Sequence, residues 1–213
     1  MMFSSIMETP LWQELNTRAR QLNSRGDILD TYTLAMFAHY LDGIKGKKIL
    51  DVGCGGDYTL TFGSGDRGTN YPPNFLRLAK SHGAIAVGLD PTINPDKEDL
   101  EAHQGYVEDI GNIFESGSFD GVLVKLLYNA PDIDLGRPSG YPMHLQREAY
   151  KQIHRILKPG GVSVSVMNAD MQHGITVPIQ EFFKSLGFEI ELYSPGKNSY
   201  DDIVVVRKPL SVV

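Results

Sequence analysis

The chain has 213 residues, of which 41% are hydrophobic and 22% are charged, a length that predicts one domain or little more. Its 20 Lys and Arg residues against 26 Asp and Glu residues give a net charge of −6, which disfavours nucleic acid as a partner. The single cysteine, Cys54, excludes a disulfide within the chain and a cysteine-rich zinc site. No apolar run approaches the roughly 20 residues that a membrane helix needs, and no secretory signal is recognisable, so we expect a cytoplasmic protein without membrane contact.

The first part of the chain predicts two helices. Thr9 and Pro10 form an N-cap and N1 pair, and apolar residues then recur at near-helical spacing until Ser24-Arg25-Gly26. Residues 27–41, rich in aromatic and apolar side chains, predict the second helix. Because both precede the first strand signal, we expect an N-terminal helical cap at residues 1–44 and a main domain at residues 45–213.

After Gly43 the pattern changes to short apolar runs separated by helical or loop stretches. The predicted strands are residues 48–52, 84–89, 104–107, 119–127, 161–167, 188–193 and 202–207. The predicted helices between them are residues 74–82, 143–157 and 179–186. This alternation favours an open α/β sheet with right-handed crossovers. Residues 58–73 and 130–142, rich in Gly and Pro, are predicted as loops over the carboxyl ends of strands.

The most informative segment is a strand that runs straight into a glycine turn. Residues 47–57 read Lys-Lys-Ile-Leu-Asp-Val-Gly-Cys-Gly-Gly-Asp. The missing side chains let a ligand lie against bare backbone at the carboxyl end of the strand, where open α/β sheets bind ligands. Two acids, Asp90 and Asp109, fall at the ends of the next two predicted strands. Asp90 is placed to accept hydrogen bonds from a ribose diol, and Asp109 to receive an adenine amino group.

The glycine turn departs from a dinucleotide-binding fingerprint. The third glycine of GxGxxG is absent, and a Gly- and Pro-rich stretch replaces the helix that would face a pyrophosphate. Asp57, directly after the turn, would repel a pyrophosphate by its like charge. The same acid is harmless beside a sulfonium or an α-amino group.

Four motifs together resemble the class I S-adenosylmethionine (SAM)-dependent methyltransferase family. They are Asp-Val-Gly-Cys-Gly-Gly-Asp at 51–57, Gly-Leu-Asp-Pro at 88–91, Val-Glu-Asp-Ile at 107–110 and Ile-Leu-Lys-Pro-Gly-Gly at 156–161. The resemblance extends over about residues 47–207. It implies a Rossmann-like α/β fold, with a seven-stranded, mostly parallel sheet and helices on both faces. The last strand is expected to be antiparallel, in a late hairpin of residues 188–193 with 202–207.

The resemblance also implies SAM as the cofactor and indicates where it binds. The residues that match the family's methionyl, ribose and adenine contacts are, in that order, Asp51, Gly53 and Gly55; Asp90; and Asp109 with Ile110. Pro91, which follows Asp90 in the Gly-Leu-Asp-Pro motif, is a further candidate for cofactor binding. Lys125, inside the predicted strand 119–127, is a further candidate for cofactor binding, although such a lysine is more often a snorkelling side chain than a catalyst. The stretch 58–73 departs from the family, which usually begins a helix right after the glycines, so it is a candidate lid or substrate determinant.

The catalytic side carries fewer signals. Tyr128 and Asn129 follow the fourth strand, where the family places groups that face the methyl, and an aromatic ring and an amide suit a sulfonium and an acceptor. The alternative is a packed aromatic and a loop cap. Cys54 is a candidate nucleophile, but inside a glycine turn the better interpretation is a small packing residue. No metal site is expected.

The sequence therefore predicts a SAM-dependent methyltransferase that acts on a small-molecule acceptor. One alternative keeps the cofactor but not methyl transfer: the aminobutyryl arm of SAM cyclises and methylthioadenosine is released. Others are a protein methyltransferase and a non-catalytic binding protein with the same fold. The oligomeric state and the acceptor are not predicted.

Overall fold

The computed structural model describes residues 10–19, 25–62, 66–71, 73–91, 93–94, 100–125, 143–167, 179–194 and 202–210. The chain divides into two compact units, Met1–Val107 and Glu108–Val213. This division differs in position from the predicted boundary between residues 44 and 45, which stays a prediction.

Three parallel strands form the sheet portion of the first unit: β1 (Lys48–Val52), β4 (Ile85–Asp90) and β5 (Glu101–Gln104). The order is β5-β4-β1, with Val52 opposite Leu89 and Leu89 opposite His103. β1 and β4 are buried along almost their whole length, as their apolar sequences predict. β5 is half exposed and polar, and it lies before the predicted strand 104–107, of which only Gln104 is in a strand.

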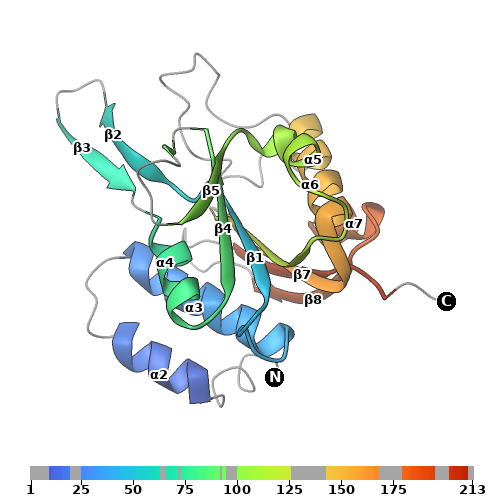
Figure 1. The fold of residues 1–213 in the computed structure, drawn as a ribbon. Helices are drawn as coiled ribbons and strands as arrows, with labels where there is room; N and C mark the ends of the chain where they lie inside the picture. Colours follow the sequence, from blue (N-terminus) through green and yellow to red (C-terminus); the bar gives the residue numbers. More distant parts are fainter. Residues whose placement is uncertain are drawn as a thin grey trace. The chain divides into compact units, whose positions relative to one another are not determined.

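Three helices accompany these strands: α2 (Pro10–Ala19), α3 (Arg25–Tyr40) and α4 (Asn74–Ser81). α2 packs on α3, α3 packs on α4, and α4 packs on β4 (Figure 1). The rings of Phe37 and Phe75 join α3 to α4, with 6.0 Å between their centroids. The N-terminal helices thus reach the sheet through α4.

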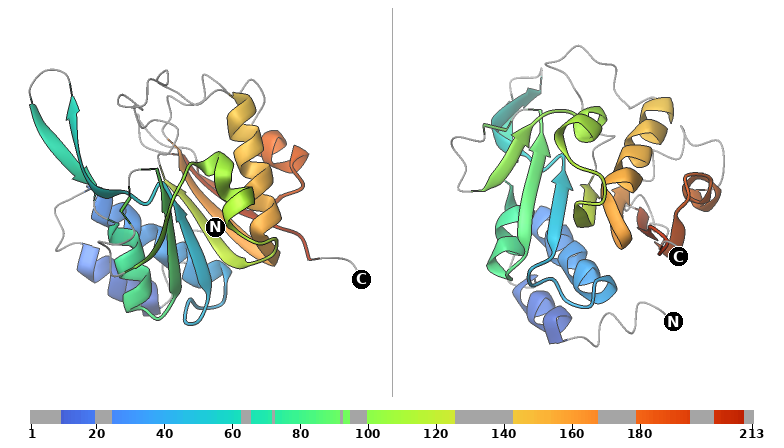
Figure 2. Two further views of the ribbon diagram at one scale, coloured as in Figure 1. Left: turned by 45° about the horizontal axis from the view of Figure 1, so that its top comes forward. Right: turned by 45° about the vertical axis from the view of Figure 1, so that its right-hand side comes forward.

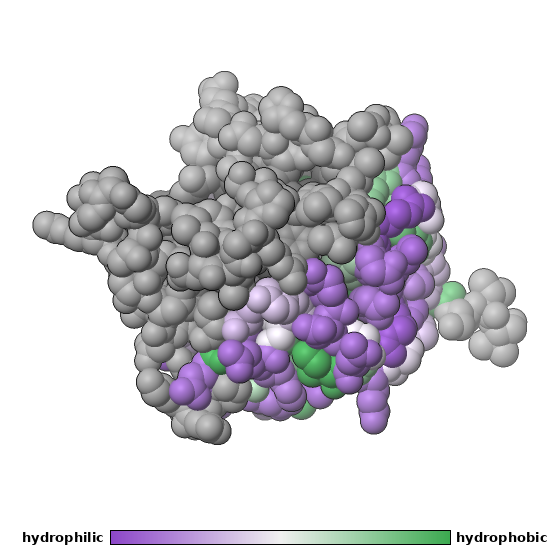
Figure 3. Space-filling view, turned by 90° about the horizontal axis from the view of Figure 1, so that it is seen from above, coloured by the Kyte–Doolittle hydropathy of each residue, from purple (hydrophilic) through white to green (hydrophobic). Residues whose placement is uncertain are grey.

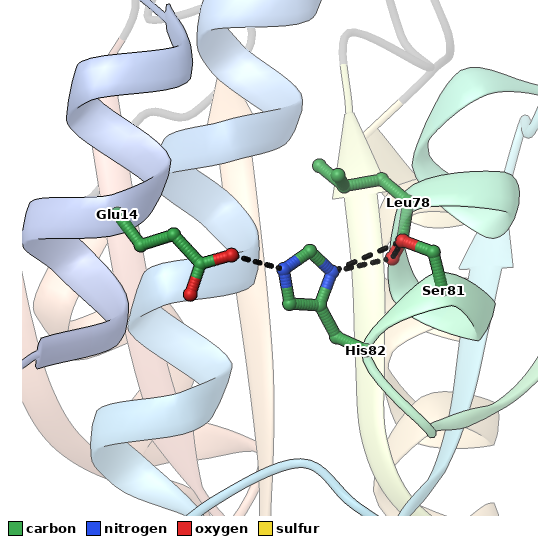
Figure 4. A network of polar contacts seen from close by, with 4 residues as sticks. All are labelled: Glu14, Leu78, Ser81 and His82. Atoms are coloured by element: carbon green, nitrogen blue, oxygen red, sulfur yellow. Dashed lines mark hydrogen bonds and ion pairs between the residues drawn. The ribbon is translucent and has the colours of Figure 1, made fainter.

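His82, directly after α4, links that helix to α2 (Figure 4). Its Nδ1 lies 2.9 Å from the carbonyl oxygen of Leu78 and 3.1 Å from Oγ of Ser81. Its Nε2 lies 3.6 Å from Oε1 of Glu14 on α2. The contact to the carbonyl oxygen requires a proton on Nδ1, because a carbonyl only accepts.

A two-stranded antiparallel ribbon follows the glycine turn, where a loop was predicted. It consists of β2 (Gly56–Phe62) and β3 (Asp66–Tyr71) and forms a sheet of its own. Gly56 is opposite Tyr71 at the base of the ribbon, and the register shifts twice along it. In Figure 1 and Figure 2 the ribbon extends away from β1 and β4. The prediction of a loop at residues 58–73 was wrong because three glycines concealed the alternation of polar and apolar residues at 57–62, which is typical of a strand.

The second unit holds β6 (Phe119–Lys125), β7 (Leu157–Met167), β8 (Glu189–Ser194) and β9 (Asp202–Arg207). β6 is parallel to β7, whereas β9 is antiparallel to both β7 and β8. The late hairpin and the antiparallel last strand are therefore confirmed. A short 3-10 turn, η2 (Val107–Asp109), leads into α5 (Ile110–Ile113), and α6 (Met143–Ile156) and α7 (Ile179–Ser185) complete the unit.

Aromatic side chains fill the core between the helices and the strands of this unit. Tyr150 of α6 is fully buried, and its hydroxyl donates to Oγ of Ser165 on β7 over 2.8 Å. Its ring meets Phe183 of α7 edge-on, with 4.8 Å between the centroids. Arg155 joins α6 to α5, because its guanidinium donates to the carbonyl oxygens of Gly111 and Phe114 over 2.9 and 2.7 Å.

The strand order of the seven-stranded sheet is β5-β4-β1-β6-β7-β9-β8. This confirms the predicted α/β, Rossmann-like fold with a mostly parallel sheet. None of the helices in the described ranges has the length and apolar content that crossing a bilayer requires. Most of the coloured surface in Figure 3 is hydrophilic, and Ile85 and Leu210 are the large hydrophobic residues that stand exposed among those described.

Candidate functional site

The glycine turn of the first unit is hydrogen-bonded to the carboxyl end of β4. β1 ends at Val52, and Gly53 and Gly55 have φ angles of 74° and 83°, a left-handed conformation that favours glycine. The N–H groups of Gly53 and Cys54 donate to the carbonyl oxygen of Leu89, over 2.8 and 3.4 Å. The next N–H, that of Gly55, donates to Oδ2 of Asp90 over 3.1 Å. Three consecutive N–H groups thus fix the turn to the last two residues of β4.

Asp90 places a buried carboxylate at the strand end. The residue is 5% exposed. The backbone around Asp90 is also held by the end of β5, because Gly105 N–H, directly after that strand, donates to the Asp90 carbonyl oxygen over 3.3 Å. Gln104 Nε2 donates to the carbonyl oxygen of the next residue, Pro91, over 3.0 Å. An ionised carboxylate has about four acceptor positions on its two oxygens, more than the Gly55 N–H occupies. Asp90 is suited to accept hydroxyl hydrogen bonds from a ligand.

Cys54 is a packing residue of the turn, as the preferred interpretation of the sequence had it. Burial raises the pKa of its thiol far above the usual range, and the charges of Asp51 and Asp90 raise it further. The thiol therefore stays neutral near pH 7 and is not an activated nucleophile. A Cβ at Gly88, on the neighbouring strand, would lie 2.8 Å from Sγ of Cys54 and 2.7 Å from Cδ1 of Leu76.

Gly88 was not singled out from the sequence, although it stands in the Gly-Leu-Asp-Pro motif. The signal was a glycine inside an otherwise apolar strand, which marks a close approach of neighbouring groups. In the register of β1 and β4, Gly88 lies opposite Asp51, which is 1% exposed. The carboxyl groups of Asp51 and Asp90 both lie close enough to Cys54 to raise the pKa of its thiol. The electrostatics of this strand end favour a cationic ligand over a pyrophosphate.

The first unit thus brings together Asp51, Gly53, Gly55, Asp90 and Pro91, five of the predicted cofactor residues. Three others belong to the second unit: Asp109 ends η2, Ile110 begins α5 and is buried, and Lys125 ends β6. The role of all eight residues in cofactor binding stays a prediction. Tyr128 and Asn129, and the loop predicted at 130–142, lie outside the described residues. Within the described ranges, no group of three or more His, Cys, Asp or Glu residues is arranged to hold a metal ion.

Neither a protein-family model nor a curated protein matches the sequence. Solved structures do match. The 1,6-didemethyltoxoflavin-N1-methyltransferase of Burkholderia thailandensis, with bound 1,6-didemethyltoxoflavin and S-adenosylhomocysteine, has a TM-score of 0.53 and 14% identity over 94% of this chain and 91% of its own. The N-methyltransferase NodS from Bradyrhizobium japonicum WM9 has a TM-score of 0.54 and 13% identity, over 88% of this chain and 99% of its own.

A third similar structure bears the name of a different reaction. The 4+2 cyclase SpnF has a TM-score of 0.55 and 14% identity, over 84% of this chain and 81% of its own. At such identities the likeness shows the fold and leaves the reaction open. Most of the similar structures are named as methyltransferases, two of them as SAM-dependent. The chain has the fold of the class I SAM-dependent methyltransferases.

Proposed function

We propose that the protein is a SAM-dependent methyltransferase that acts on a small-molecule acceptor. The observation that carries the proposal is the buried carboxylate of Asp90, which accepts a hydrogen bond from the glycine turn at the end of β1 in this fold. Open α/β sheets bind ligands at the carboxyl ends of their strands, and both groups lie there.

The residues present fit this cofactor. Asp90 offers carboxylate oxygens to the two ribose hydroxyls, and Gly53 and Gly55 leave the backbone of the turn bare for the methionyl part. The negative charges of Asp51 and Asp90 suit a molecule with an ammonium and a sulfonium group. Asp109 and Ile110 are assigned to the adenine, and Pro91 and Lys125 to further cofactor contacts. When bound, the cofactor supplies a methyl group activated by its attachment to a sulfonium.

The chain's task in such a reaction is alignment. Holding the acceptor in line with the methyl lowers the activation free energy by on the order of 7–11 kcal/mol in favourable models. A base is needed only where the acceptor atom must lose a proton. Tyr128 and Asn129 are proposed to face the methyl and the acceptor.

Two observations support a small acceptor. The net charge of −6 opposes the long-range attraction that nucleic-acid substrates require. One of the proteins with a similar fold is named as a methyltransferase of 1,6-didemethyltoxoflavin, and its structure contains that small molecule. A protein acceptor is the alternative outcome of the acceptor test below.

A second candidate function consumes the cofactor alone. In it SAM is the only substrate, its aminobutyryl arm cyclises, and methylthioadenosine is released. The β2–β3 ribbon favours this candidate, because it follows the turn proposed to bind the methionyl part, where the resembling family usually begins a helix.

Calorimetry with S-adenosylhomocysteine tests the cofactor site. We expect binding to the wild-type protein and a loss of about 10- to 100-fold in affinity in Asp90→Ala, since a hydrogen bond to a charged group contributes about 1.5–3 kcal/mol. Glu101→Ala, an exposed acid at the start of the neighbouring strand, is the matched control and retains the affinity. Absence of binding to the wild type, or unchanged affinity in Asp90→Ala, would overturn the proposal.

Incubation with methyl-labelled SAM tests the reaction. Label in a small molecule of a cell extract supports the proposed transfer, and label in protein supports the protein alternative. Methylthioadenosine formed without any acceptor supports the second candidate.

A further inference from the structure

The position of the β2–β3 ribbon depends on its root. The ribbon is a sheet of its own and is not paired with the other strands. Two-stranded ribbons are marginally stable in water by themselves, so what holds one end of such a ribbon decides how it moves. The root is formed by Gly55, the residue just before β2, and by the opposed pair Gly56 and Tyr71.

The root is tied to the end of β4 through one side chain. Gly55 N–H donates to Oδ2 of Asp90, a buried bond between residues 35 positions apart. The bonds of Gly53 and Cys54 to Leu89 fix the turn one step earlier and go to backbone oxygen. The bond of Gly55 differs from these two, because its acceptor is a side chain, and it is the side chain proposed to bind the ribose.

In the proposed holoenzyme, Asp90 joins the root of the ribbon to the ligand. The carboxylate that accepts the Gly55 N–H is the one proposed to accept the ribose hydroxyls. A ligand bridged to the same carboxylate restrains its rotation and makes the Gly55 bond longer-lived. By thermodynamic reciprocity, whatever orders the root then also strengthens ligand binding.

We infer that Asp90 is a positioning residue for the ribbon, and that the ribbon is a strap ordered by the cofactor, beside the turn proposed to bind the methionyl part. This inference rests on the proposed function for the identity of its ligand. The anchor, by which we mean the bond from Gly55 N–H to Asp90 Oδ2, does not depend on that proposal, because it is present in the chain alone. The strap links cofactor occupancy to the order of the ribbon that follows the glycine turn.

Hydrogen exchange measured by mass spectrometry on the full chain tests the anchor without any ligand. In Asp90→Ala, exchange of the amides in residues 56–71 accelerates by about fivefold or more, the factor that corresponds to one ordinary hydrogen bond. Asp90→Asn keeps a weaker, uncharged acceptor and gives a smaller acceleration. Amides of α4 and of residues 85–89 keep their exchange rates in both variants, whereas general destabilisation would accelerate them too. Unchanged exchange in the ribbon in both variants would overturn the inference.

The same measurement with S-adenosylhomocysteine separates the two proposals. We expect slower exchange at residues 53–55 and throughout 56–71 of the wild type, and little slowing of the ribbon in Asp90→Ala at a ligand concentration that saturates it. Slowing at 53–55 without slowing in the ribbon contradicts the strap and leaves the cofactor site standing. If the ligand slows exchange in no part of the wild-type chain, the proposed cofactor site is contradicted. The comparison of the ligand-free proteins then still tests whether Asp90 anchors the ribbon.

Discussion

Cys54, in the turn after β1, lies so close to Gly88 of the neighbouring strand β4 that a Cβ on Gly88 would come within 2.8 Å of Sγ of Cys54. Cβ atoms in folded proteins essentially never approach a heavy atom so closely, so the two residues constrain one another. The turn that follows β1 can therefore pack against β4 in this way only if residue 88 has no side chain.

Gly88→Ala is expected to destabilise the protein by about 1–3 kcal/mol, because the added methyl overpacks Cys54 and Leu76. Urea denaturation gives the free energy of unfolding. In Cys54→Ala the sulfur is absent, so Gly88→Ala costs less in that background than in the wild type. Strictly additive losses in the double variant would contradict the direct contact.

Cys54 is expected to resist alkylation in the folded state. Burial raises the pKa of the thiol, and thiolate is the reactive form. Iodoacetamide at pH 7 to 8.5 should modify the native protein far more slowly than the protein in denaturant, with the extent followed by mass spectrometry. Rapid alkylation of the native chain would show that the turn exposes the thiol.

His82 is expected to contribute more to stability than Glu14. The His82 side chain is 14% exposed, and its Nδ1 is hydrogen-bonded to the carbonyl oxygen of Leu78. The Glu14 side chain is 70% exposed, and its Oε1 lies 3.6 Å from Nε2 of His82, a long distance for an ion pair. We expect His82→Ala to cost about 1 kcal/mol through the lost hydrogen bond and Glu14→Ala about 0–0.5 kcal/mol, as for exposed ion pairs. Thermal denaturation of both variants measures the two losses of stability. A larger loss in Glu14→Ala than in His82→Ala would contradict this ranking.

His154 is expected to make stability fall on acidification. Burial lowers its pKa from the ordinary 6.5, and the charge of Lys208 lowers it further. The unfolded chain then binds more protons than the folded chain as the pH falls below 6.5, so the free energy of unfolding decreases there. His154→Gln, which does not titrate, should show a weaker decrease between pH 7.5 and pH 5.5. An equal decrease in the two proteins would assign the effect to other groups.

The sequence was sufficient for the parts of the molecule that bury apolar side chains on a regular period. β1, β4 and β9 are predicted within a residue of their ends, since their apolar runs are nearly continuous. β5 escaped detection because it is half exposed, and Glu-Ala-His-Gln carries no apolar run. The ribbon escaped because its glycines resemble those of a loop.

For the candidate site, the sequence predicted the individual residues but not the contacts between them. The glycine turn and the acid at 90 could each be named from local motifs. Their hydrogen bond spans 35 positions and follows only from the parallel pairing of β1 with β4. The close approach at Gly88 likewise depends on side chains from α4 and from the turn. Contacts of this kind are set by tertiary packing and leave no periodic trace.

A crystal structure of the protein with bound S-adenosylhomocysteine tests the central claim most directly. We predict that both ribose hydroxyls lie within hydrogen-bonding distance of the Asp90 carboxylate, with the homocysteine moiety against Gly53 and Gly55. A nucleoside bound elsewhere, or a ribose turned away from Asp90, would contradict the account.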